Sequence, residues 1–188
     1  ELFKNMRSTT RNLISTAEKE GVTITASDNP LRDLPLFLRL HDETRQRHSF
    51  TPYTNAFFHA QMKHFPKRAT PAPEQSSVRG TASNEPTSPR SPSCTLYLAH
   101  YKDEVIAASI HIHFAGETSY HHGASTQKHR NIPASYLLQW QAIQDAIARE
   151  DRIYNFWGIA PSRNDGNPIV HPDKTIGDEQ RIFLQEKQ

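Results

Sequence analysis

The stretch from Thr95 to Pro161 constrains the fold of this chain more than any other part of it. It holds three segments with alternating apolar residues, then one segment with helical spacing, then a short aromatic segment. Alternation with period two indicates strands, and apolar residues three and four apart indicate a helix. Tight turns join the first three segments, so these strands are expected to be antiparallel neighbours. The order predicts an α/β fold with a mixed, largely antiparallel sheet.

The middle strand of the three is predicted to have two unlike faces, because successive side chains of a strand point to opposite sides of the sheet. One face holds Ile106, Ala108, Ile110, Ile112 and Phe114, and the other holds Val105, Ala107, Ser109, His111 and His113. Turns at Lys102-Asp103 and at Ala115-Gly116-Glu117 are expected to bound this strand.

The helical segment is predicted to begin with Pro133 at its first position, which proline suits. Five large apolar residues recur at helical spacing and are expected to face the sheet: Tyr136, Leu137, Trp140, Ile143 and Ile147. Alternation over residues 153–157 predicts a last strand after this helix.

Three further helices and one short strand are predicted nearer the N-terminus. The first helix covers residues 8–20, with Ser8 or Thr9 as its cap and Gly21 in the left-handed position after its end. Alternation over residues 22–27 predicts the strand. A second helix is expected to be capped by Asp33, and a third runs over about residues 54–64.

Residues 66–93 interrupt the pattern of the chain. They hold six of the 13 prolines, and Val78 is their one large aliphatic residue. Such a segment buries too little apolar surface to offset the entropy lost on ordering. We expect residues 1–188 to form one domain with residues 66–93 as a disordered insertion and 172–188 as an atypical tail. A linker between two domains is the alternative for residues 66–93.

Composition bears on location and on partners. The formal net charge of +2 is too small to support a global electrostatic argument for nucleic-acid binding. No apolar run is long enough to predict a transmembrane segment, and the N-terminus has no apolar signal core. The single cysteine, Cys94, excludes an intrachain disulfide and suits a reducing compartment. A cytoplasmic location is therefore expected.

The first candidate site is the start of the helix at Pro133. Lys128, His129 and Arg130 come directly before it. Free backbone N–H groups and the helix dipole attract anions at such an end, and fixed cations add to the attraction. Arg130 is therefore a candidate substrate-binding residue for a phosphate or carboxylate. A solvated basic turn is the alternative.

The second candidate site is a set of four histidines: His111, His113, His121 and His122. A polar wall of a substrate cleft and hydrogen-bonded structural histidines are both open interpretations. A metal site is less favoured because carboxylate and cysteine partners at ligand spacing are missing. No metal and no cofactor is therefore expected. His111 and His122 are the catalytic candidates, because a neutral imidazole accepts a proton from an attacking ammonium group.

The third candidate site is the basic start of the first helix. Arg7 and Arg11 lie four residues apart and share a helix face, where an arginine can grip a phosphate with its guanidinium fork. A solvated helix face is the alternative. No serine, cysteine or carboxylate nucleophile motif is present, and neither is a glycine-rich phosphate loop.

Three blocks of the sequence resemble the Fem family of peptidoglycan bridge-forming aminoacyltransferases (FemABX), whose domains are GNAT-like. They are TRNLISTAEKEGV (10–22), ETRQRHSFTPYTNAFF (43–58) and residues 104–161, which include NIPASYLLQWQAIQDAI and YNFWGIAP. The resemblance implies a GNAT-like fold. It also implies transfer of an amino acid from aminoacyl-tRNA to the amine of a peptidoglycan-precursor peptide, with a nucleotide-linked muropeptide or a lipid-linked precursor as acceptor.

The same resemblance implies roles for particular residues. By position, Arg11 and Arg47 are expected to contact acceptor phosphates, and Tyr120, His122 and Trp157 are expected to line the cleft. The phenylalanine–lysine pair that follows the third block in the family has no counterpart here, because Lys174 and Lys187 stand in another context. A GNAT-type N-acyltransferase that uses acyl-CoA and an inactive binding remnant are therefore the alternatives. The acyl-CoA alternative is less favoured, because the residues before Pro133 lack the glycine-rich loop that binds the CoA pyrophosphate.

Overall fold

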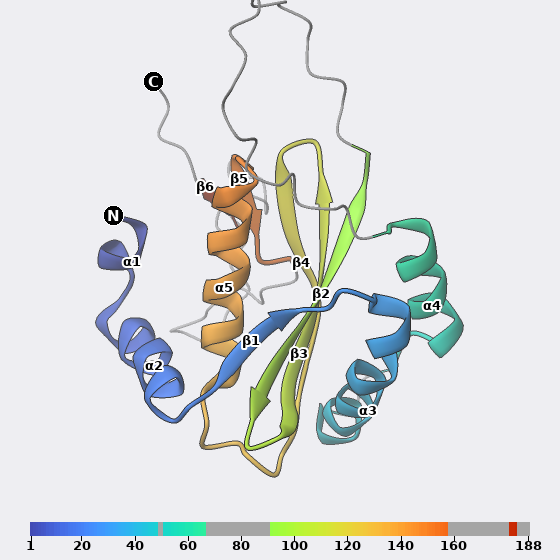
Figure 1. The fold of residues 1–188 in the computed structure, drawn as a ribbon, viewed down its shortest axis with the longest axis horizontal. Coiled ribbons are helices and arrows are strands. Elements are labelled where there is room, and N and C mark those ends of the chain that lie inside the picture. Colours follow the sequence, from blue (N-terminus) through green and yellow to red (C-terminus); the bar gives the residue numbers. More distant parts are fainter. Residues whose placement is uncertain (49–50, 67–90, 158–180, 184–188) are drawn as a thin grey trace, which may run out of the picture.

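The structure is a computed structural model that describes residues 1–48, 51–66, 91–157 and 181–183. The described strands form one sheet in the order β1-β2-β3-β4-β5-β6 (Figure 1). They are β1 Thr23–Ala26, β2 Ser93–Tyr101, β3 Glu104–Phe114, β4 Glu117–Ser125, β5 Ile153–Asn155 and β6 Arg181–Phe183. All neighbouring strands are antiparallel except β4 and β5, which are parallel. The predicted mixed, mostly antiparallel α/β sheet is confirmed.

Helices cover both faces of this sheet. They are α1 Leu2–Asn5, α2 Ser8–Lys19, α3 Pro30–His48, α4 Asn55–His64 and α5 Ala134–Ala148. Figure 1 shows α2 and α5 on one side of the sheet and α3 and α4 on the other. Helix α5 is also the crossover between the parallel strands β4 and β5, since such strands need a long connection.

Each face of the sheet has its own apolar core. Tyr97, Ala99, Leu137, Leu138 and Ile143 belong to the core on the α5 side. Leu34, Phe37, Phe58, Leu96 and Ile110 belong to the core on the α3 and α4 side. Burial of these side chains on both faces makes the sheet a rigid support for whatever lies at its edges.

A register shift corrects the predicted faces of β3. Val105 pairs with His100 and Ala107 pairs with Ala99, so Ile106 is an extra residue in the ladder. Such a bulge breaks the period of two. Val105 consequently packs in the core beside α3, and Ile106 packs in the core beside α5, the reverse of the predicted arrangement.

The helix starts also differ from the predicted caps. The residue before α2 is Arg7, and its side chain makes no capping hydrogen bond. Helix α3 begins at Pro30, and Asn29 accepts a hydrogen bond from the Arg32 N–H at 3.1 Å. Asp33 lies inside the first turn, where it accepts from Ser27. Asparagine satisfies an open N–H group as well as aspartate does, so both residues suited the role.

Helix α5 starts one residue later than predicted, with Pro133 as its cap. Its buried face also differs. Tyr136 is 44% exposed and Ile147 is 43% exposed, while Leu138, Ala142 and Ala146 are buried. Small alanines allow the helix to approach the sheet closely, so the large residues at the edge of the stripe are left outside.

Thr54 fixes the start of α4. Its side chain accepts a hydrogen bond from the Phe57 N–H at 3.2 Å. Replacing a threonine N-cap by alanine costs about 1 kcal/mol. We expect Thr54→Ala to lower the free energy of unfolding by about that amount in urea titrations. Thr51→Ala, at an exposed position in the same segment, is the matched control. An equal effect of both changes would contradict the capping role.

Candidate active site

The parallel strands β4 and β5 stay together over only a short distance. Three residue pairs join them, from Glu117 with Ile153 to Ser119 with Asn155. Strand β4 then continues to Ser125. Within the described parts of the chain, this second half of β4 has no strand partner on the β5 side. The sheet therefore opens along one edge of β4.

A bulge in β4 lies at the point where the strands part. His111 pairs with Tyr120 and Ile110 pairs with His122, so His121 is an extra residue in the ladder. Regular alternation would place His121 and His122 on opposite faces. Instead His121 contacts Gln61 of α4, and the ring of His122 lies 4.9 Å from that of Phe58, also on α4. Both imidazoles thus face α4.

A pocket of about 230 Å³ lies against the open edge of β4. It is bounded by the end of α3 and the start of α5, and its lining includes Arg47, Ser109, Tyr120, Gly123, Leu138 and Gln139. We call it the edge pocket. Its volume is below the range of about 300–1,000 Å³ typical of ligand sites, so it suits a small chemical group.

A second pocket of about 450 Å³ lies on the α4 side of the sheet. Its lining includes Phe57, Gln61, Phe65, Ile112, His121 and Trp157. We call it the aromatic pocket. Tyr120 lines the edge pocket and His121 lines the aromatic pocket, so one backbone segment of β4 separates the two.

Trp157 has an unusual backbone conformation. Its φ of 53° is in the left-handed region, which bulky residues rarely adopt. Its N–H donates to the Asn155 side chain at 2.9 Å, and its ring lies 5.1 Å from that of His121. Backbone strain of this kind persists where surrounding contacts impose it, and it is common at functional sites.

Gly123 makes room for Tyr120. A Cβ atom at position 123 would lie 1.6 Å from the Tyr120 hydroxyl oxygen and 2.6 Å from its ring carbon Cζ. No side chain fits at those distances, so only glycine lets the tyrosine lie across the strand. The shape of the edge pocket depends on this close approach, because both residues line it.

His111 lies sealed beneath α5. It is fully buried, and its Nε2 is 2.8 Å from the Tyr154 hydroxyl oxygen. Burial lowers the pKa of His111 to about 3, so the imidazole stays neutral. Burial also lowers the pKa of His122 to about 3, and the Nε2 of His122 has no hydrogen-bond partner among the described residues.

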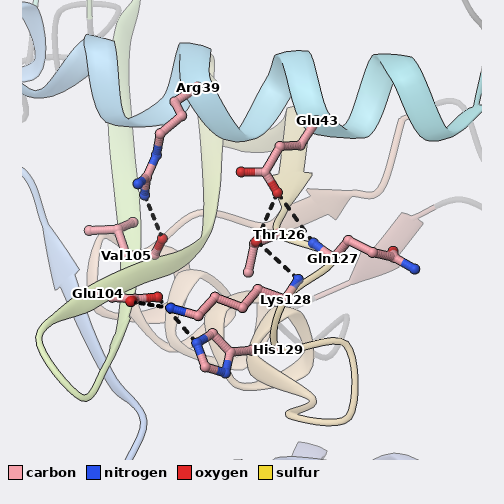
Figure 2. Close-up of polar contacts among 8 residues, drawn as sticks. All are labelled: Arg39, Glu43, Glu104, Val105, Thr126, Gln127, Lys128 and His129. Carbon is pink, nitrogen blue, oxygen red and sulfur yellow. Dashed lines mark hydrogen bonds and ion pairs between the residues drawn. The ribbon is translucent and has the colours of Figure 1, made fainter.

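The loop before α5 is held by two carboxylates (Figure 2). Glu43 accepts hydrogen bonds from the Thr126 hydroxyl at 2.8 Å and from the Gln127 N–H at 3.3 Å. Glu104 contacts the ammonium group of Lys128 and lies 3.2 Å from Nε2 of His129. The hydrogen bond from Lys128 and that of His129 lower the pKa of Glu104. Two members of the predicted anion seat therefore already have an acidic partner.

The predicted site residues are distributed over several places. Arg47 and Tyr120 line the edge pocket, and Trp157 lines the aromatic pocket. The Arg11 guanidinium donates to the carbonyl of Lys4 on α1. Arg130 is exposed in the loop before α5. Neither Arg11 nor Arg130 lines either pocket, and neither does His111 or His122. Lys174 and Lys187 lie outside the described residues.

His121 belongs to the predicted histidine set and lines the aromatic pocket. Sequence reasoning did not propose Gln61, Ser109 or Gln139 as site residues, although they also line the two pockets. His121 could not be placed because the bulge is not visible as a break in the pattern. One signal was present: Gly123 stands inside a strand, where an isolated glycine suggests a bulge or a close backbone approach.

Two strands that part around a bulge, with a crossover helix beginning at the opening, define a GNAT-like fold. A comparison with protein-family models matches the FemAB family over residues 1–70 and 89–171. The chain belongs to the FemAB family.

Two solved structures support the same fold, and a third matches with a lower score. A crystal structure of FemX matches with a TM-score of 0.66 and 13% identity over 88% of this chain. The C-terminal domain of a putative lysylphosphatidylglycerol synthetase from Agrobacterium fabrum matches with a TM-score of 0.50 and 7% identity, and covers 78% of this chain and 41% of that one. The ribosomal-protein-S18-alanine N-acetyltransferase from Escherichia coli has a TM-score of 0.45 and 15% identity, with coverage of 71% and 64%.

This chain spans 52% of the FemX chain. A search of curated proteins found no match. No helix in the described parts of the chain is long and apolar enough to cross a membrane.

Proposed function

We propose that this chain takes part in transferring an amino acid from aminoacyl-tRNA to an amine of a peptidoglycan-precursor peptide. The observation that carries this proposal is the pair of pockets separated by the Tyr120–His121 segment of β4. A reaction between two substrates requires two binding sites close to each other, and membership of the FemAB family supports aminoacyl transfer as the reaction.

The edge pocket suits the donor. It is small, and Arg47 at its rim can approach a phosphate of the tRNA end, because a guanidinium group presents paired N–H donors to phosphate. The aromatic pocket suits the aliphatic part of an acceptor side chain that ends in an amine. Its walls are largely apolar, with Phe57, Phe65 and Trp157 among them. This proposal moves Arg47 from the acceptor phosphates, where the resemblance placed it, to the donor. Arg11 remains a proposed contact for an acceptor phosphate, and Arg130 remains a proposed contact for a phosphate or carboxylate.

The chemistry needs no covalent enzyme intermediate. The acceptor nitrogen attacks the ester carbonyl carbon, the new C–N bond forms, and the C–O bond to the tRNA ribose breaks. The nitrogen loses a proton and the ribose oxygen gains one. The protein contributes by holding the two groups together and by stabilising the carbonyl oxygen as charge develops on it.

In the direct test, the protein is incubated with charged tRNA and a nucleotide-linked muropeptide, and the mass of the muropeptide is measured by mass spectrometry. A mass increase of one amino-acid residue is expected. Because the chain spans 52% of FemX, the assay is repeated with the flanking coding sequence included. Absence of product in both assays would overturn the proposal. A cytoplasmic location is part of it, because charged tRNA is the donor.

The same assay separates the proposal from its alternatives. Thermal stabilisation by CoA, with product formed from acyl-CoA and none from charged tRNA, would identify an N-acyltransferase instead. Muropeptide binding without product would identify an inactive binding domain. The single-domain organisation over residues 1–188 is tested by limited proteolysis, which is expected to cut within residues 66–93 and leave the remainder associated.

Arg47 offers a test of the donor side. Its guanidinium is exposed and contacts the Ser125 carbonyl at 3.3 Å and the Gln127 side chain at 3.2 Å. We expect Arg47→Gln to lower kcat/KM for charged tRNA about tenfold, as the loss of one charge-assisted contact would do. Arg45→Gln on the same helix, where Arg45 pairs with Asp42, is the matched control. Equal effects of the two changes would contradict the role of Arg47.

A further inference from the structure

A chain of buried hydrogen bonds begins and ends at the edge pocket. Ser109 Oγ lies 3.4 Å from His111 Nδ1, and His111 Nε2 lies 2.8 Å from the Tyr154 hydroxyl oxygen. The Tyr154 hydroxyl then donates to Gln139 Oε1. The first and last members, Ser109 and Gln139, both line the pocket, while His111 and Tyr154 are fully buried behind it.

The donors in this series of hydrogen bonds can be ordered in only one direction. The Tyr154 hydroxyl has a single proton and gives it to Gln139, so its oxygen must accept from His111. Nε2 of His111 therefore carries the proton of the neutral ring. Nδ1 is left as an acceptor, and Ser109 is its donor.

The direction determines what each end offers to the pocket. Ser109 directs its proton to His111, so its oxygen lone pairs are left for a ligand. Gln139 has its oxygen occupied by Tyr154, which leaves its NH₂ group to interact with the Tyr120 hydroxyl oxygen. The proton of Tyr120 is then left for a ligand. The pocket thus presents one acceptor, Ser109, and one donor, Tyr120.

We propose that the edge pocket binds the aminoacyl end of the donor, with its α-amino N–H on Ser109 Oγ and its carbonyl oxygen on the Tyr120 hydroxyl. An aminoacyl ester carries a donor and an acceptor on adjacent carbons, which matches this pair, whereas a simple acyl group carries only the acceptor. The inference rests on the proposed function and assigns the discrimination between aminoacyl and acyl donors to Ser109.

Charge and size agree with this assignment. Ser109 is 1% exposed, so the group that it binds loses its contact with water. An ammonium ion is costly to bury beside a single neutral acceptor and near the cationic Arg47, whereas a neutral amine is not. α-Amino groups have a pKa of about 7.7–8.0, so a fraction of them is uncharged near pH 7. The small volume admits the aminoacyl group and leaves the nucleoside outside.

Two stable donor analogues test the inference by calorimetry: 3′-alanylamido-3′-deoxyadenosine and its propionylamido counterpart, which lacks only the α-amine. We expect the wild-type chain to bind the alanyl compound about tenfold more tightly, as one hydrogen bond allows. Ser109→Ala should reduce the preference to less than about twofold with unchanged affinity for the propionyl compound. Tyr120→Phe should weaken both compounds to a similar extent. A preference that survives Ser109→Ala overturns the inference.

The direction of the hydrogen-bond chain has its own readout, which does not depend on any ligand. In ¹⁵N-histidine NMR spectra, His111 is expected to carry its proton on Nε2, and the signal is assigned through its shift in Ser109→Ala. Tyr154→Phe keeps the ring in place and should erode the alanyl preference. A proton on Nδ1 would make Ser109 accept from His111. The Ser109 hydroxyl would then offer the pocket a proton in place of a lone pair, and the inference would be overturned.

The outcomes for the two proposals are separable. Product from charged tRNA, together with equal binding of the two analogues, would leave the proposed function standing and reject the assignment of Ser109. Binding of neither analogue by the folded wild-type chain would reject both.

Discussion

Replacement of Asp151 by alanine is expected to lower the free energy of unfolding by about 3 kcal/mol, as does the breaking of a buried charge pair. Asp151 is 4% exposed, accepts from the Thr118 hydroxyl at 2.5 Å and lies 3.2 Å from the Arg149 guanidinium. Thr118 in turn lies 2.9 Å from His113. Removal of the carboxylate would leave a buried hydroxyl and a charge without this partner.

Urea unfolding checks this expectation. Asp42→Ala is the matched control, because Asp42 forms a pair with Arg45 that is solvent-exposed and should cost at most about 1 kcal/mol. Asp151→Asn keeps the shape and one acceptor oxygen, so it should fall between the two. Equal losses for Asp151→Ala and Asp42→Ala would contradict the buried role. The cluster joins β4 to the start of β5 just before the strands part, so its loss should also reduce transfer.

Gly123→Ala is expected to lower the proposed transfer activity about a hundredfold, the effect of misplacing a group at a reaction site by about an ångström. The added Cβ would lie 1.6 Å from the Tyr120 hydroxyl oxygen, so the tyrosine ring must leave its place. The ring is held on its inner side, with its centre 5.5 Å from that of His111. It therefore moves outward, into the edge pocket.

Gly21→Ala is the control for backbone strain. Gly21 has a φ of +84°, so alanine is strained there, but a Cβ would have no neighbour within 4 Å in the described ranges of the chain. That variant should lose stability and keep its activity, measured with charged tRNA and muropeptide. In a double-mutant cycle, Tyr120→Ala should remove most of the stability cost of Gly123→Ala, since nothing is left to collide with. Additive costs would show that the two residues do not collide.

Much of the fold was predictable from local patterns. Tight turns such as Lys102-Asp103, whose residues both have positive φ, and the alternation of Leu96 and Leu98 with Tyr97 led to the correct antiparallel strands. Thr54 was likewise at the start of a predicted helix that the structure confirms. These signals are local, so a single sequence carries them.

The candidate site was less predictable, because its geometry depends on two bulges. One inserted residue at Ile106 exchanged the faces of its neighbours in β3. Another at His121 brought two imidazoles to one face. Bulges arise from the pairing of distant strands, and nothing in the residues themselves breaks the alternation. Burial was equally hidden: the pattern placed His111 in a strand but could not show that Tyr154 and α5 seal it.

The opposite directions of the neighbouring Tyr120 and His121 side chains also have a consequence for how such a protein can change. Since these two side chains line separate pockets, the proposed function predicts that substitutions around Trp157 alter the choice of acceptor. The groups that Ser109 and Tyr120 are proposed to offer to the donor would be unchanged. Variants selected for new acceptors should therefore accumulate changes on α4, while the opposite wall stays as it is.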